Sequence, residues 1–409
     1  MQKPAKRSPF RPGPGALVTA AFIGPGTITT CSLAGAQFGY ALLWGLTFSV
    51  VATIILQEMS ARLGIITRHG LGEALRTQFS TPASRIITAI LVVSAITIGN
   101  AAFQTGNILG ASIGLQSLIN ADFLPLRFWV ALNAAAAFLL LLAGSYKLIE
   151  RVLIGLVILM SLTFLTTAII VSPHLPEILK GMFVPAIPSG SILTLVGLIG
   201  TTVVPYNLFL HSSAVQERWK DASGLGEARV DISVSVILGG LISMAIVVTS
   251  AVAFFGTGNT ITDASDFAVQ LEPLLGRWAR HVISIGLFAA GISSAITAPL
   301  AAAYATAGIF GWKRDLTSWR FRMVWMFILL AGTLFSMLGL KPLEAILFAQ
   351  AANGILLPVI AIYLLTVMNS RKIMGDNTNT RISNIAGIIV VLVALGLGVR
   401  SILHVIGII

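Results

Sequence analysis

A Gly-Pro-Gly sequence at residues 24–26 interrupts the first long apolar segment of the chain, which runs from Pro14 to Tyr40. Proline has no backbone N–H and glycine favours open backbone, so a regular α-helix cannot continue through these residues. In hydrocarbon, the freed backbone groups are costly unless they line a cavity or are buried in protein. A break at mid-depth therefore predicts a binding site, and a kink that serves only packing is the alternative.

The composition is that of a membrane protein with many spans. Only 10% of the 409 residues are charged and 56% are hydrophobic, whereas soluble proteins carry about 25% charged residues. A single cysteine, Cys31, excludes an intrachain disulfide. We expect one transmembrane domain over residues 1–409, all α-helical, with eleven spans of bilayer length. These spans are 14–39, 42–63, 86–116, 127–146, 152–172, 191–213, 231–256, 280–311, 323–340, 344–368 and 383–407.

The basic residues indicate how the chain is oriented in the membrane. Most of the 26 Lys and Arg residues lie on one side when the eleven spans are threaded alternately across the bilayer. The positive-inside rule makes that side cytoplasmic. We therefore expect a cytoplasmic tail at residues 1–13, an extracytoplasmic C-terminus and a bacterial inner (plasma) membrane location. The same rule accounts for the net charge of +11 without a nucleic-acid partner.

A second interrupted span lies at 191–213, where Gly200 and Pro205 fall inside an apolar segment. The breaks occur in spans one and six, at matching positions of two five-span halves. This arrangement is typical of an inverted-repeat transporter with its binding site near the middle of the membrane. We expect repeat one at 14–172, repeat two at 191–368 and an additional helix at 383–407.

Several motifs resemble the NRAMP (natural resistance-associated macrophage protein) family of transporters over almost the whole chain. They are GPGT at 24–27, AGAQFGY at 34–40, QEMSARLG at 57–64 and VPYNLFLHS at 204–212. The resemblance implies a LeuT-type fold with five-plus-five inverted repeats, and secondary active transport by alternating access. Helices 1 and 6 would be the two broken ones.

The sequence departs from this family at the residues that bind transition metals. Family members that carry metals read Asp-Pro-Gly-Asn at the first break, where this chain has Gly24 and Thr27. At the second break, the family methionine before the proline is Val204 and the histidine after it is Tyr206. Thr201 replaces a family alanine. By this resemblance the chain is a divergent member without the usual Asp, Asn and Met ligands.

Two family carboxylates that assist proton movement correspond to the amides Gln104 and Asn107, while a family glutamine of the tenth span survives as Gln350. None of the fifteen acidic residues falls at mid-membrane beside either break. Divalent ions are held in proteins by carboxylates, imidazoles or thiolates. The sequence therefore predicts no metal site of the transition-metal type.

The remaining groups are hydroxyls, amides and the N-termini of two half-helices, each of which carries about half a positive charge. This composition favours a small anion, with bicarbonate as the first choice. The alternative for any single threonine is that its hydroxyl bonds back to its own helix and does not contact a substrate. The predicted substrate-binding residues are Gly24, Gly26, Thr27, Thr29, Thr30, Thr201, Thr202, Val204, Tyr206, Asn207 and Gln350.

Uptake of an anion into a negative cell needs a driving ion. Ser293, Ser294 and Thr297 of the eighth span are candidates for a Na⁺ site, and helix packing is the alternative explanation for such small polar residues. His211 either relays a proton or packs between helices. Apart from a coupling Na⁺, we expect no cofactor.

Two other functions remain open. One is a divalent-metal (Mn²⁺- or Mg²⁺-type) transporter whose site is rebuilt from Gln350, Tyr206 and Asn207. The other is a membrane sensor that retains the fold without transport. An enzyme is not expected, because no nucleophile–base pair or nucleotide-binding motif is present. The expected partners are a small ion and the lipid bilayer, and the sequence predicts no oligomeric state.

Overall fold

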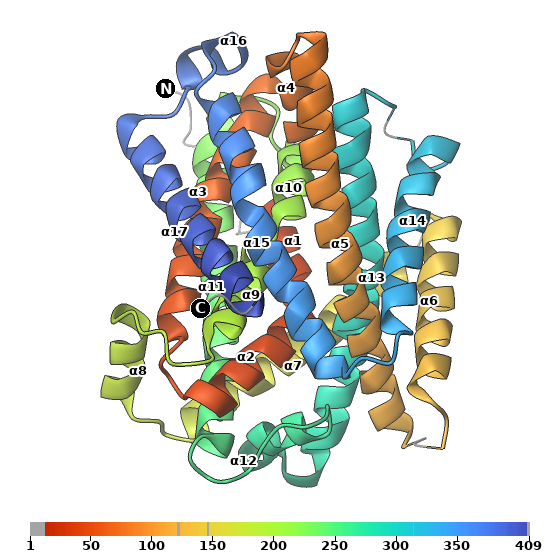
Figure 1. The fold of residues 1–409 in the computed structure, drawn as a ribbon, viewed down its shortest axis with the longest axis vertical. Helices are drawn as coiled ribbons and strands as arrows, with labels where there is room; N and C mark the ends of the chain where they lie inside the picture. The colour runs from red at the N-terminus through yellow and green to blue at the C-terminus, as the bar shows by residue number, and fades with distance from the viewer. Residues whose placement is uncertain (1–12, 121–122, 145–146, 314, 407–409) are drawn as a thin grey trace, which may run out of the picture.

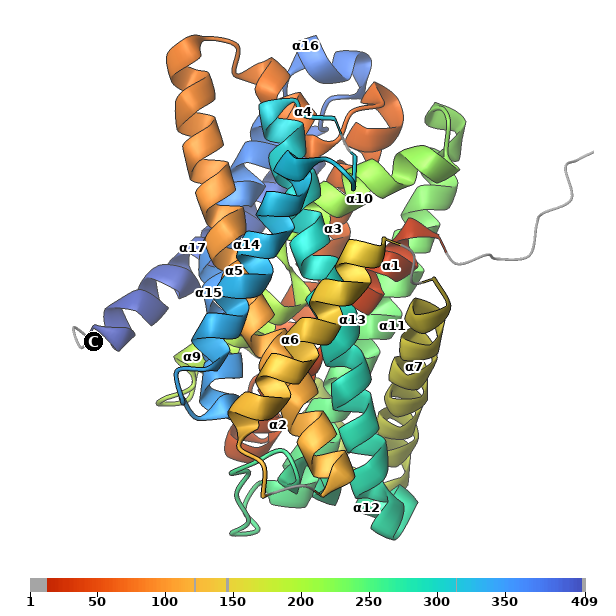
Figure 2. The same ribbon diagram turned by 90° about the vertical axis from the view of Figure 1, so that its right-hand side faces the viewer.

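The computed structural model describes residues 13–120, 123–144, 147–313 and 315–406, and these residues form helices joined by short loops (Figures 1 and 2). Each of the eleven predicted spans is helical over most of its described residues, so the all-α polytopic prediction is confirmed. Residues 1–12 of the expected N-terminal tail, 145–146 of the fourth predicted span and 407 of the last lie outside the described part. The spans are α1 (Pro14–Phe22) with α2 (Pro25–Phe38), α3 (Leu43–Thr67), α5 (Pro82–Ile119), α6 (Leu126–Ala143), α7 (Lys147–Ile170), α9 (Ile192–Thr202) with α10 (Pro205–Arg218), α11 (Leu225–Phe254), α13 (Ala279–Phe310), α14 (Trp319–Ser336), α15 (Pro342–Met368) and α17 (Arg381–Val405).

Short helices occupy the connections that the sequence predicted only as loops. α4 (Leu71–Gln78) and α16 (Arg371–Met374) lie at one end of the bundle, and α8 (Leu175–Phe183) and α12 (Glu272–Leu275) lie at the other (Figure 1). The remaining short elements are the 3₁₀ turns η1 (Ala222–Gly224), η2 (Asp266–Leu271), η3 (Gly276–Trp278) and η4 (Gly375–Asn377).

Nine helical segments of the described chain are long and apolar enough to cross a bilayer by length and composition. The other two spans are the broken α1–α2 pair and α14. The two pieces of the first pair have only 9 and 14 residues, because the break separates them. α14 begins with Trp319 and contains Arg320 and Arg322, which lower the hydropathy of its first turn.

Local sequence determines where many of these helices begin. Proline at the first helical position opens α2, α5, α10 and α15, where its missing N–H has no intrahelical partner to lose. Elsewhere the side-chain oxygens of Thr81, Ser318 and Thr380 accept hydrogen bonds from backbone N–H groups in the first turn.

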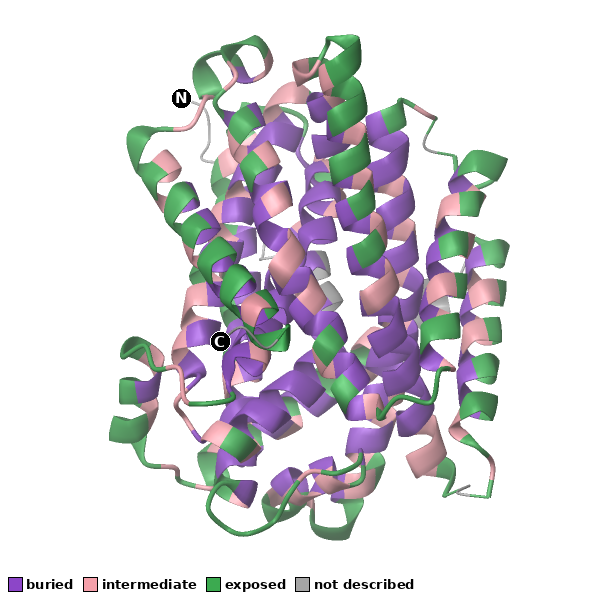
Figure 3. Ribbon diagram, viewed as in Figure 1, coloured by how far each residue is buried: buried purple, intermediate pink, exposed green. Residues whose placement is uncertain are grey.

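Both predicted breaks are present. In the first, α1 ends at Phe22 and α2 starts at Pro25, with extended backbone at Gly24. In the second, α9 ends at Thr202 and α10 starts at Pro205, with extended backbone at Val204. The broken helices lie in the purple, buried centre of the bundle, while the outer faces of helices such as α17 are exposed (Figure 3).

Helix α11 holds both halves of the first broken helix. Near its start, the buried Asp231 accepts hydrogen bonds from the N–H groups of Gly13 and Gly15 at 2.8 and 2.7 Å. Near its other end, Ser250 donates to Ser32 O of α2 at 2.6 Å. Gln270 of η2 adds a bond from its amide nitrogen to the Ser32 hydroxyl at 2.9 Å. α11 thus fixes the start of α1 and the middle of α2.

Candidate functional site

The two breaks meet in the interior. Thr27 of α2 and Thr201 of α9 place their hydroxyl oxygens 2.7 Å apart, and Thr27 also donates to the carbonyl oxygen of Phe22 at the end of α1. No predicted substrate-binding side chain exposes more than 1% of its surface, and Gly24 and Gly26 are buried as well. The predicted substrate-binding residues are therefore all closed to solvent, and Thr27 and Thr201 bring the two breaks into contact.

Gln350 of α15 connects the two broken helices. A Cβ atom on Gly26 would lie 2.1 Å from Gln350 Nε2, so the side chain lies directly over the start of α2. A Cβ atom on Gly200 of α9 would lie 2.0 Å from the backbone oxygen of Gln350. Neither side-chain atom of the buried Gln350 amide has a hydrogen-bond partner in the structure. A free donor and a free acceptor consequently lie between the breaks.

The second break supplies further polar atoms without partners. Both amide atoms of Asn207 and the hydroxyl of Tyr206 are buried and unpaired. The Tyr206 ring packs edge-on against Phe103 of α5, with ring centroids 5.7 Å apart. Buried polar groups in proteins are normally paired, and unpaired ones cost free energy. These unpaired atoms are therefore the candidate positions for contacts with a ligand or water.

The threonines fall into two groups. The hydroxyls of Thr29 and Thr30 are buried without a partner. The Thr202 hydroxyl instead donates to Leu198 O of its own helix at 3.0 Å. For Thr202 the structure therefore shows the alternative to ligand contact, a hydrogen bond back to its own helix. Val204 has an apolar side chain, and its carbonyl already accepts from Asn207 N–H at 3.1 Å.

The candidate Na⁺ residues are placed unequally. Ser294 of α13 lies beside the first break, where a Cβ atom on Gly24 would be 3.2 Å from the Ser294 hydroxyl. The Thr297 hydroxyl bonds to the carbonyls of Ser293 and Ser294 in its own helix, at 3.2 and 3.5 Å. Of these three residues, Ser294 is thus the one with a close contact to the first break.

The two amides at the former proton-path positions are buried in α5. Gln104 donates to Ala295 O of α13 at 3.1 Å, and its Oε1 accepts from Asn107 Nδ2 at 3.4 Å. Asn107 Oδ1 has no partner. His211 lies on α10, one turn beyond Asn207, and its Nδ1 is buried and unpaired.

Among the described residues there is no group of three or more His, Cys, Asp or Glu side chains placed to hold a metal ion. Asp231 is the buried acid that the sequence placed at a span end, whereas the structure places it inside α11. Its carboxylate is paired with the start of α1, away from the breaks.

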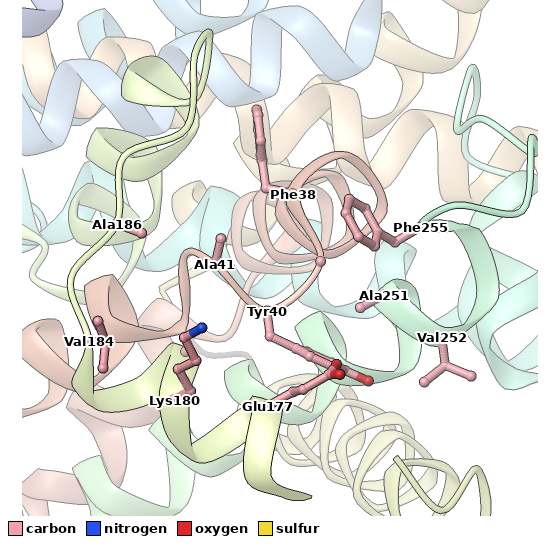
Figure 4. A pocket seen from close by; sticks show the side chains of 12 residues that line it. Phe38, Tyr40, Ala41, Glu177, Lys180, Val184, Ala186, Ala251, Val252 and Phe255 are labelled. Carbon is pink, nitrogen blue, oxygen red and sulfur yellow. The ribbon is translucent and has the colours of Figure 1, made fainter. Parts of the chain in front are cut away.

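A surface cavity of about 540 Å³ lies at the far end of α2, between α2, α8 and α11 (Figure 4). Tyr40 and Glu177 bring their oxygen atoms together there, and Lys180 lies on the neighbouring wall. Burial, and then the charge of Glu177, raise the pKa of Tyr40 above its usual value. The cavity is separate from the candidate site, since none of the predicted substrate-binding residues lines it.

An all-helical fold with five-plus-five inverted repeats, and with its first and sixth helices broken around a buried polar centre, defines a transporter of the LeuT-fold class. The chain matches the family model "Natural resistance-associated macrophage protein-like" over residues 15–404. It therefore belongs to the Nramp family, as its motifs predicted, and is an Nramp-type membrane transporter.

Relatives and solved structures agree with this assignment. The chain is 29% identical to the "Divalent metal cation transporter MntH" of Pectobacterium carotovorum, covering 93% of this chain and 91% of the relative. The MntH of Klebsiella pneumoniae is 28% identical, with 90% and 88% covered. A mutant of the Eremococcus coleocola manganese transporter has the same fold, with a TM-score of 0.77, 23% identity, and 100% and 90% covered. MhsT has a TM-score of 0.62, 15% identity, and 95% and 97% covered.

Proposed function

We propose that this chain is a secondary active transporter that moves a small oxyanion, bicarbonate in the first place, by alternating access. The observation that carries the proposal is the cluster of unpaired, uncharged polar groups between the two breaks. Its potential donors are the amides of Gln350 and Asn207 and the hydroxyl of Tyr206. No carboxylate among the described residues lies with them to repel an anion.

The backbone at the breaks also favours an anion. Since Pro25 and Pro205 have no N–H, the first amides available at the starts of α2 and α10 belong to Gly26 and Tyr206. The opposite, carbonyl end of α1 is already occupied, because Phe22 O accepts from both Gly24 N–H and the Thr27 hydroxyl. Donors are therefore free at the breaks while this acceptor is satisfied by the protein.

A divalent metal ion is the second candidate, and the names of the relatives favour it over an anion. The MntH proteins are named as divalent metal cation transporters, and the Eremococcus protein as a manganese transporter. In this chain such a site would use Gln350, Tyr206 and Asn207. Removing water from a divalent ion is costly, and most protein sites for such ions offset the cost with charged ligands. Neutral oxygens alone offset it poorly. The donor set is therefore our reason for placing the anion first.

Na⁺ is proposed as the coupling ion, with Ser294, whose hydroxyl lies against Gly24 at the first break, as the first candidate ligand and Ser293 and Thr297 as further candidates. We also propose that the end of the bundle with α4 and α16 is cytoplasmic, as the distribution of basic residues favours. In this orientation the N-terminus is cytoplasmic and the C-terminus extracytoplasmic.

Uptake by the purified full chain in proteoliposomes tests the proposal. Labelled bicarbonate and Mn²⁺ are offered separately, each with and without an inward Na⁺ gradient. We expect saturable bicarbonate uptake that the Na⁺ gradient accelerates, and no Mn²⁺ uptake above that of empty liposomes. Mn²⁺ uptake that other divalent metals inhibit, with no bicarbonate uptake, would establish the second candidate instead.

A further inference from the structure

A proline inside α13 leaves one backbone carbonyl without its helical donor. Pro299 has no N–H, so Ala295 O, four residues earlier, lacks the usual intrahelical hydrogen bond. Gln104 of α5 supplies the missing donor through its Nε2 atom, at 3.1 Å. The Gln104 side chain is fully buried and packs on Gly332 of α14, where a Cβ atom would lie 2.5 Å from Gln104 Cγ.

This bond determines how the next amide is oriented. A carbonyl only accepts hydrogen bonds, so the NH₂ group of Gln104 must face Ala295 O. Gln104 Oε1 then faces the other way and accepts from Asn107 Nδ2 at 3.4 Å. Asn107 is left with Oδ1, which is buried and has no partner. The atom that ends this chain of amides is therefore an acceptor.

Neighbouring residues place Asn107 at the first break. A Cβ atom on Gly110, one turn further along α5, would lie 2.1 Å from the ring of Pro25. A Cβ atom on Gly106 would lie 3.4 Å from Gln350 Nε2. On the adjacent helix, Ala295 follows Ser294, which approaches Gly24. The free oxygen of Asn107 thus belongs to the side of the site that holds the start of α2.

We propose that Asn107 Oδ1 accepts the hydroxyl hydrogen of a hydrogen-bearing oxyanion, and that Gln104 is the positioning residue that holds Asn107 in this orientation. The inference rests on the proposed function and narrows its substrate class. Bicarbonate has one O–H group to donate, whereas nitrate has the same planar shape and charge without a hydrogen. Nitrate would leave a buried acceptor facing an anion oxygen, so the site discriminates against it.

Competition between the two anions tests this inference. The Michaelis constant for bicarbonate and the inhibition constant of nitrate are measured in proteoliposomes for the wild type, Asn107→Leu and Gln104→Met. Thr105→Val is the matched control on α5, because the Thr105 hydroxyl bonds only to Ala101 O of its own helix. Loss of one hydrogen bond to the substrate corresponds to about a tenfold change in discrimination.

We expect nitrate to inhibit the wild type and Thr105→Val weakly. In Asn107→Leu and Gln104→Met, we expect the preference for bicarbonate over nitrate to be about tenfold lower. Gln104→Met leaves Asn107 in place, so its effect on the ratio of the two constants distinguishes orientation from a general loss of activity. A wild type that carries bicarbonate while both variants keep the ratio would overturn this inference alone. A wild type without bicarbonate uptake would overturn the proposed function and this inference with it.

Discussion

The two breaks are built alike but bonded differently. At the first, the hydroxyl of Thr27 is used twice within the protein, once toward Phe22 O and once toward Thr201. At the second, Asn207 and Tyr206 hold buried polar atoms that bond to nothing. Each half-helix nevertheless begins with proline after an extended residue.

The difference suggests a structural role for Thr27 and a ligand-binding role for Asn207 and Tyr206. At the first break the Thr27 hydroxyl ties α1, α2 and α9 together, whereas at the second the side chains of Asn207 and Tyr206 leave their polar atoms free. Gln350 lies between them, with its side chain over Gly26 and its backbone against Gly200. We therefore expect loss of the Thr27 hydroxyl to affect stability more than transport, and loss of the Asn207 amide to affect transport more than stability.

The largest effect is expected from Gly26→Ala. The new methyl group would lie 2.1 Å from Gln350 Nε2 and 2.4 Å from Gln350 Cδ, so the amide must leave its place. A displacement of this size costs about 100-fold in rate where a group is positioned for its substrate. The measurement is initial uptake of bicarbonate, with Gly155→Ala as control, because nothing lies within 4 Å of a Cβ atom there.

Asn207→Leu is expected to reduce uptake by about tenfold, since one or two hydrogen bonds to the substrate are lost. The thermal midpoint should stay the same or rise, because the substitution removes buried polar atoms that have no partner. Uptake and thermal unfolding are measured on the same preparation. A lower midpoint with unchanged uptake would reverse the roles assigned to the two breaks.

Thr27→Val should show the opposite pattern. It removes the bonds of the Thr27 hydroxyl to Phe22 O and Thr201 and leaves the buried Thr201 hydroxyl without a partner, which costs about 1–3 kcal/mol of stability. We expect a lower midpoint of thermal unfolding and a smaller change in uptake than for Asn207→Leu. If uptake falls more than in Asn207→Leu while the midpoint is unchanged, Thr27 contacts the substrate.

The smallest effect is expected from Thr202→Val. The Thr202 hydroxyl donates to Leu198 O in its own helix, and loss of one such hydrogen bond changes stability by about 0.5–1.5 kcal/mol. Uptake should remain within about twofold of the wild type by the same reasoning. A tenfold loss of uptake would show that Thr202 belongs to the substrate site.

The sequence predicted the eleven spans and both breaks because their signals are local. Pro25 and Pro205 stand next to or near glycines within apolar segments and mark the breaks, although a proline alone does not end a helix, as Pro299 inside α13 shows. Apolar length alone identifies most spans. The short helix α4 was missed as a helix because its polar composition resembles that of a loop. Asp231 was expected at the end of a span, and its burial depends on pairing with α1, which is distant in sequence.

The candidate site was predicted as a set of residues, but their bonding depends on contacts between helices. Thr27, Thr30 and Thr202 are equivalent as residues, yet only Thr30 has a buried hydroxyl without a partner. The role of Gln104 follows from Pro299, which is almost two hundred residues away in the chain. Such pairings become visible only when the helices are packed.

The most direct test of the central claim is to return negative charge to the site. The double substitution Gly24→Asp and Thr27→Asp places two carboxylates at the start of α2, and bicarbonate uptake is compared with that of the wild type in the same proteoliposomes. If the site selects an anion because it lacks acidic groups, the wild type takes up bicarbonate and the double variant loses it. Bicarbonate uptake that persists in a folded double variant would contradict the account.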